Sequence, residues 1–242
     1  MEFSPEELKR IIERPGPLNL QNRDLSGANL RSVNLSRADL RGADLHEADL
    51  TQAVLRYADI DGAIFEKANL SKAYLYGTNL FSANFTSATF WRTNLYGAPL
   101  VCASFSGARL IEANLSYCRL LCADLEDSIL WCANLEYSWL NLARLSGSNL
   151  EGANLTCASF EGTLMVECEL SGAKLNYASF NEADLSGSNL EGASLLNTDF
   201  SGAILNGVNL EGVEFYSDSS WLGTKWPDGF DPIKAGAVLL DG

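Results

Sequence analysis

The chain has 242 residues, an ordinary hydrophobic fraction of 47%, and a formal net charge of -14 from 17 basic and 31 acidic side chains. Because nucleic-acid backbones and anionic lipids repel an acidic surface, this balance argues against both as partners. The first residues show neither the basic nor the apolar segment of a secretory signal, and no run of about 18 apolar residues follows. We therefore expect a cytoplasmic protein that does not enter a membrane.

The first predicted element is a short helix at the amino terminus. Ser4 stands at an N-cap position, a proline follows it, and Glu7 stands where a capping box requires an acidic residue. Apolar residues continue at helical spacing: Leu8, Ile11 and Ile12. We expect a helix over about residues 5–14, within a cap of residues 1–17 that covers the first repeat.

A strict repeat of five residues follows the cap. From Leu20 to Phe215, every fifth residue is large and apolar, and most of these centres are leucine. Two residues before each centre, from Ala28 onward, only Ala, Ser, Thr, Cys or Val occurs, which indicates a tightly buried position. A period of five fits neither the helical period of about 3.6 nor the strand period of about 2. Each unit is therefore predicted to be a short extended segment followed by a corner.

Glycine marks the predicted corners. Most of the glycines, such as Gly27 and Gly107, lie two residues after a centre. A type II turn requires positive φ at its third residue, and glycine adopts positive φ without a steric cost. The pattern therefore predicts a type II turn in each unit.

The motif A(D/N)LXX recurs along this segment, as ANL at 28–30 and 153–155 and as ADL at 38–40. On these residues the chain resembles the pentapeptide-repeat family over about residues 18–217. The resemblance implies an all-β fold: a right-handed quadrilateral parallel β-helix of about ten coils, with four pentapeptides in each coil. The centre and the small residue would point inward, and the other three residues outward.

The sequence positions of the tyrosines test how many sides one coil has. If four units make a coil, residues 20 apart share a side, whereas a three-sided coil would scatter them. All eight tyrosines fall in units on one such side: Tyr57, Tyr74, Tyr76, Tyr96, Tyr117, Tyr137, Tyr177 and Tyr216. We therefore predict a nearly neutral side lined with tyrosine, while the side of Leu25 carries more acidic residues than any other side.

Outward apolar residues also gather at mid-length. We call this set the mid-rod belt, and it consists of two columns and a tryptophan beside them: Phe81, Val101 and Leu121; Trp91, Ile111 and Trp131; and Trp139. Contiguous exposed apolar residues usually mark an interface, although stacked like residues can also serve only to stabilise adjacent coils. The candidate interaction surface is the belt together with four tyrosines: Tyr76, Tyr96, Tyr117 and Tyr137.

No catalytic site is predicted. The single histidine, His46, lies on a different side from the outward cysteines, so no Cys–His pair can form. Cys102 and Cys122 are 20 apart and should stack in one column, but a zinc site needs about four ligands. Six cysteines without a CxxC motif fit a reducing compartment. We therefore expect no enzyme activity, no bound metal and no cofactor.

After Phe215 the period stops, and residues 218–242 are predicted to form a C-terminal cap. This segment is rich in aromatic residues, proline and glycine, and contains Trp221, Leu222, Trp226 and Phe230. The tail is similar to those of cyanobacterial members of the family, which implies a non-enzymatic protein-interaction scaffold or regulator with an unidentified protein partner. A weak homodimer through a terminal cap or the mid-rod belt is also compatible with this pattern. The alternative is a DNA mimic that modulates a type II topoisomerase, like the acidic quinolone-resistance members.

Overall fold

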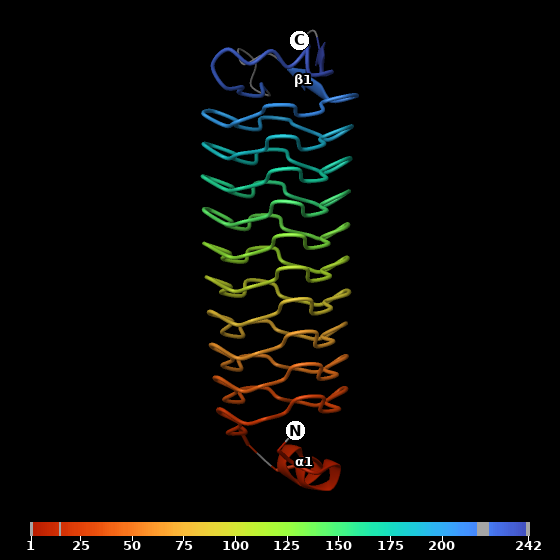
Figure 1. Ribbon diagram of the computed structural model, residues 1–242, viewed down its shortest axis with the longest axis vertical. Helices are drawn as coiled ribbons and strands as arrows, with labels where there is room; N and C mark the ends of the chain where they lie inside the picture. The colour runs from red at the N-terminus through yellow and green to blue at the C-terminus, as the bar shows by residue number, and fades with distance from the viewer. Residues whose placement is uncertain (1, 15, 217–222, 241–242) are drawn as a thin grey trace.

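The computed structural model describes residues 2–14, 16–216 and 223–240. The chain winds into a long stack of coils, with the amino terminus at one end and the carboxyl terminus at the other (Figure 1). Parallel bridges join nearly every unit to the unit 20 residues further along, as in the pairs Asn29–Asp49 and Asp49–Asn69. Four five-residue units therefore make one coil, as the spacing of the tyrosines predicts.

Nearly every corner is a β-turn closed by a backbone hydrogen bond. The Ala28 N–H donates to the Leu25 carbonyl at 3.0 Å, and the third residue of this turn, Gly27, has a φ of 64°. The same position has positive φ at the other described corners, although most of the residues there are not glycine; Tyr117, for example, has a φ of 60°. The position of the corner is thus predicted correctly, but glycine is not required there.

Hydrogen bonds explain why other residues accept positive φ, which costs an L-residue about 1–2 kcal/mol. At one corner the Thr86 N–H donates to Asn84 Oδ1 at 3.0 Å, and the Ser87 N–H donates to the Ser106 carbonyl of the next coil at 2.9 Å. Where an Asp or Asn precedes the centre, as Asn84 does, its side chain therefore caps the turn that follows. This is the physical role of the second letter of the A(D/N)LXX motif.

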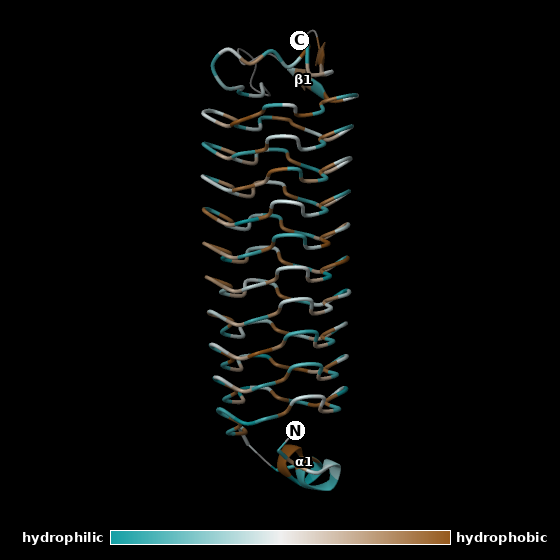
Figure 2. Cartoon of the chain, viewed as in Figure 1, coloured by the Kyte–Doolittle hydropathy of each residue, from teal (hydrophilic) through white to brown (hydrophobic). Residues whose placement is uncertain are grey.

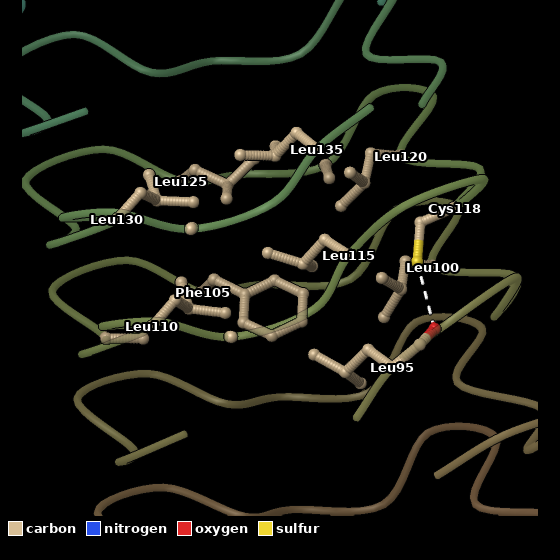
Figure 3. Packing of buried hydrophobic residues seen from close by; sticks show 14 of the residues in the cluster. Leu95, Leu100, Phe105, Leu110, Leu115, Cys118, Leu120, Leu125, Leu130 and Leu135 are labelled. Carbon is tan, nitrogen blue, oxygen red and sulfur yellow. Dashed lines mark hydrogen bonds between the residues drawn. The ribbon is translucent and has the colours of Figure 1, made fainter. Parts of the chain in front are cut away.

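The centres and the small residues fill the interior. Leu115 and Phe105 are fully buried, and neighbouring centres stack along the axis (Figure 3). Where a polar residue replaces alanine at the small position, its side chain usually finds a backbone partner one coil below. Cys118 Sγ donates to the Leu95 carbonyl at 3.0 Å, as the dashed line in Figure 3 shows. The interior thus tolerates these polar atoms because they are hydrogen-bonded.

The amino-terminal cap is helix α1 (Pro5–Ile12). It begins with the predicted capping box between Ser4 and Glu7, and it ends two residues before the predicted boundary. Leu8 is buried in the core cluster, and Figure 2 shows apolar and polar residues on different parts of this helix. The prediction of one short amino-terminal helix is confirmed. Within the described residues, no helix has the length and apolar character needed to cross a membrane.

The carboxyl-terminal segment folds back onto the last coil. Strand β1 (Glu214–Tyr216) pairs in parallel with strand β2 (Val238–Leu240). Trp226 packs against the core and contacts the rings of Phe200, Phe215 and Phe230. The other two apolar residues of the predicted cap, Trp221 and Leu222, lie outside the described residues.

A candidate protein-interaction surface

Most of the predicted surface residues lie at the corners, one or two positions after a centre. We call three of these columns the Phe81 corner (Phe81, Val101, Leu121), the Trp91 corner (Trp91, Ile111, Trp131) and the tyrosine corner (Tyr76, Tyr96, Tyr117, Tyr137). Because four units make a coil, the Phe81 and Trp91 corners are half a coil apart and therefore lie opposite one another. The mid-rod belt is consequently not one patch. The tyrosine corner lies between its two columns.

The tyrosine corner is a continuous ladder of rings. The centroids of Tyr76 and Tyr96 are 6.0 Å apart, and those of Tyr117 and Tyr137 are 5.0 Å apart with planes inclined by 20°. The rings remain half-exposed, 50% in the case of Tyr117. Hydrogen bonding to Cys157 raises the pKa of Tyr137. Ring pairs of this kind contribute about 0.5–1.5 kcal/mol, so the ladder stabilises adjacent coils and also presents a rigid aromatic surface.

A single flat side joins the tyrosine corner to the Phe81 corner. Trp139 lies on this side with 58% of its surface exposed, and the Arg119 guanidinium is 5.9 Å from the centre of its ring. Phe81 and Leu121 are also exposed. Leu142, which is 58% exposed, extends the Phe81 corner by one coil. We call the tyrosine corner, Trp139 and the Phe81 corner together the Tyr–Trp face. It holds eight of the eleven residues of the interaction surface predicted from the sequence.

The Trp91 corner has different surroundings. Lys72 Nζ lies 4.7 Å from the centre of the Trp91 ring, and the Arg92 guanidinium lies 4.9 Å from it. Arg92 also donates to Glu112 Oε2 at 2.7 Å. Trp91 is therefore partly covered by cations and is only 36% exposed, whereas Trp131 is 49% exposed. Lys72 and Arg92 therefore occupy part of the Trp91 ring surface that a partner would otherwise contact.

The rod offers little that resembles a catalytic centre. Within the described residues, no group of three His, Cys, Asp or Glu side chains is arranged to hold a metal ion. His46 Nδ1 is 3.5 Å from Asp44 Oδ1, and both side chains are largely exposed. Three hollows lie at the ends of the rod, one beside α1 and two beside the carboxyl-terminal segment. At mid-length the described residues present exposed aromatic and aliphatic side chains, such as Trp139 and Leu121.

Coils of 20 residues, each made of four turns around a leucine-rich core, define a protein built from short sequence repeats. The sequence model of one family, Pentapeptide repeats, matches overlapping segments of the chain: residues 19–52, 48–86, 78–116, 108–147, 143–179 and 178–215. The chain belongs to the pentapeptide repeat family, which confirms the resemblance of the A(D/N)LXX motif.

Solved structures of other members are similar. HetL of the cyanobacterium Nostoc sp. strain PCC 7120, a pentapeptide repeat protein involved in heterocyst differentiation regulation, is 34% identical; the alignment covers 95% of this chain and 99% of HetL, with a TM-score of 0.53. The pentapeptide repeat protein alr5209 from Nostoc is 25% identical over 52% of this chain and 84% of its own, with a TM-score of 0.35. Full-length QnrB1, a plasmid-mediated fluoroquinolone resistance protein, is 18% identical over 80% of this chain and 94% of its own, with a TM-score of 0.37. Among curated proteins there is no match.

Proposed function

We propose that this right-handed, four-sided rod of about ten coils is a cytoplasmic scaffold or regulator that binds another protein and carries out no catalysis. The observation that carries the proposal is the Tyr–Trp face, where aromatic rings stay exposed although the repeat requires no apolar residue there. Trp139, at 58% exposure, is the largest of them. The involvement of HetL in the regulation of heterocyst differentiation supports the same class of function, because this chain matches HetL over nearly its whole length.

The composition of the Tyr–Trp face fits a binding surface. Tyrosine and tryptophan anchor protein interfaces because they bury a large area while losing few side-chain rotamers. Stacking of Tyr117 on Tyr137 holds both rings in place before a partner arrives. Preorganised side chains lose less entropy on binding, so the ladder should favour affinity.

The charge distribution predicts what kind of partner fits. The corner diagonally opposite the tyrosine corner carries acidic residues such as Glu47, Glu126 and Glu167, whereas the tyrosine corner is nearly neutral. A partner on the Tyr–Trp face should therefore present an apolar and uncharged polar surface. Its affinity should depend only weakly on salt, because exposed charges contribute little at that distance.

The test compares two double variants with the native protein as baits in extracts of the native cell. Tyr117→Ser/Trp139→Ser removes two rings of the face, while Glu47→Gln/Glu167→Gln is the matched control on the acidic corner. We expect the first variant to lose the captured protein, with an affinity at least about tenfold weaker by calorimetry, and the control to keep it. Loss in the control alone, or binding that weakens steeply with salt, would contradict the proposal. Melting temperatures well above the temperature of the assay for all baits ensure that unfolding is not the cause.

A further inference from the structure

Two cysteines at the Phe81 corner occupy equivalent positions in consecutive coils. Cys102 and Cys122 are free and exposed, and each is the third residue of its turn, with φ of 56° and 55°. The Cys102 N–H donates to the Leu121 carbonyl at 3.0 Å. The two backbones are therefore in register at the spacing of neighbouring strands, about 4.8 Å. That spacing falls within the Cα separation of disulfides, about 4.4–6.8 Å.

The opposite corner shows how near a thiol in this position comes to the coil above. A Cβ atom placed on Gly152 would lie 3.3 Å from Cys132 Sγ, one coil below it. In a disulfide the two Cβ atoms lie about 3.8 Å apart, with both sulfurs between them. Rotation of the side chains with a small backbone adjustment would therefore bring two thiols at this spacing into bonding distance.

The other four cysteines have no thiol in register with them. Cys118 and Cys168 are buried in the core, where burial raises the pKa of the thiols to about 12 and about 11. Cys132 has Gly152 above it, and Cys157 has tyrosines on both sides in its column. Cys102 and Cys122 are thus the single pair, and a reagent that requires two neighbouring thiols would select them.

We propose that Cys102 and Cys122 form a redox-active dithiol, which a low-molecular-weight disulfide such as oxidised glutathione converts to an intramolecular disulfide. One cysteine thiolate attacks a glutathione sulfur, the glutathione S–S bond breaks, and one glutathione thiolate leaves. The second cysteine thiolate attacks the protein sulfur of this mixed disulfide, forming the protein S–S bond and releasing the second glutathione. The two cysteines are oxidised, the reagent is reduced to two glutathione molecules, and the cysteine protons pass to the leaving thiolates.

This disulfide should be easy to reduce. Both turns have the same conformation, so the two Cα–Cβ bonds point in parallel instead of converging. A bridge between parallel Cβ atoms is strained, and exposed or strained disulfides have the higher reduction potentials of labile bonds. The bridge would link two coils next to Leu121 on the Tyr–Trp face, but the inference does not rest on that face binding a partner.

The experiment uses the full chain with Cys132→Ser, which leaves Cys122 as the single cysteine of its tryptic peptide. Trypsin cuts after Arg109 and Arg119, so the peptides of Cys102 and Cys122 stay together only if a disulfide joins them. After native protein is incubated with oxidised glutathione and alkylated, mass spectrometry should show the linked peptides, with two hydrogen atoms lost and no attached glutathione. Dithiothreitol should separate them.

Two variants decide between outcomes. Cys122→Ser should stop at a stable mixed disulfide of glutathione with Cys102, because no second thiol is in reach. Gly152→Cys, in the chain that retains Cys132, places a second pair at the same spacing on the opposite corner, and it should form the corresponding bridge. If the native pair accumulates only glutathione adducts, or links two chains instead of two coils, the proposal is wrong.

Discussion

The indole ring of Trp226 lies parallel to the ring of Phe200, with centroids 5.2 Å apart and planes inclined by 6°. Phe200 itself continues a column of parallel rings that passes through Phe180 to Phe160. Lys225 forms a parallel β-bridge with Asp199, as the corresponding residue of a further coil would. The two residues are 26 apart in the sequence, whereas bridged residues in the repeat are 20 apart. Trp226 therefore takes the place of the next centre, and the tail closes the open end of the core.

Trp226→Ala should lower the free energy of unfolding by about 2–3 kcal/mol, somewhat less than a fully buried aromatic residue, because Trp226 is half-buried. Urea denaturation followed by circular dichroism measures the change. Trp139→Ala is the matched control: its ring is exposed and should contribute less than about 1 kcal/mol. Equal losses in the two variants would show that Trp226 does not close the core.

Trp91→Ser/Trp131→Ser tests whether the Trp91 corner is a second binding surface. Replacing Trp131 should lower the free energy of unfolding by no more than about 0.5 kcal/mol. Replacing Trp91 should lower it by about 1 kcal/mol more, because the contacts with Lys72 and Arg92 are lost. If this corner recognises a partner or a second copy of the chain, capture or self-association disappears although the melting temperature falls by only a few degrees. A variant that still retains its partner and melts lower than this loss predicts would identify both tryptophans as structural residues of the ladder.

The purified protein should leave DNA supercoiling by a type II topoisomerase unaffected at micromolar concentration. The acidic corner lacks the continuous charge of a DNA backbone, because basic residues neutralise it locally: Arg144 pairs with Glu126 at 2.7 Å, and Lys67 with Glu66 at 3.1 Å. A gel assay of supercoiling over a range of protein concentrations measures the effect. Dose-dependent inhibition would instead favour DNA mimicry as the function.

The buried thiols should make stability depend on pH in the alkaline range. Burial raises the pKa of Cys118 to about 12, above the value of about 8.5 in an unfolded chain. The folded state thus favours the neutral thiol, so its contribution to stability is complete below about pH 8.5 and is lost as the pH rises toward the folded pKa. Urea midpoints should therefore fall between about pH 9 and 11.

Cys118→Ala/Cys168→Ala supplies the control, because alanine is the usual residue at the small position. This variant should show a flatter pH dependence than the native chain over the same range. In the native state at pH 8, iodoacetamide should modify Cys132 but leave Cys118 and Cys168 intact. Rapid labelling of either buried cysteine, or identical pH profiles for the two proteins, would contradict the assignment.

Much of the interaction surface could be predicted because the repeat separates inward from outward residues. Phe105 and Ala103 occupy positions that the core requires to be apolar, whereas Trp139 occupies one that it does not. What the pattern did not show is how the exposed residues combine. The coil geometry puts Phe81 and Trp91 on opposite corners and places Trp139 on the side between the tyrosine and Phe81 corners, so one predicted belt becomes two surfaces.

The sequence alone determined the features that repeat at short range: the buried centres, the small inward residues, the corners and the four units per coil. These leave a trace in every unit because each coil meets the same packing requirement. It also determined the start of α1, because the capping box of Ser4 and Glu7 is a local pattern. Only the tertiary structure decided that Tyr117 accepts positive φ, since hydrogen bonds from the neighbouring coil support its turn. It also decided that Trp226 continues the column of Phe200. Trp226 follows the end of the five-residue repeat at Phe215, so the period of the sequence does not predict which ring it contacts.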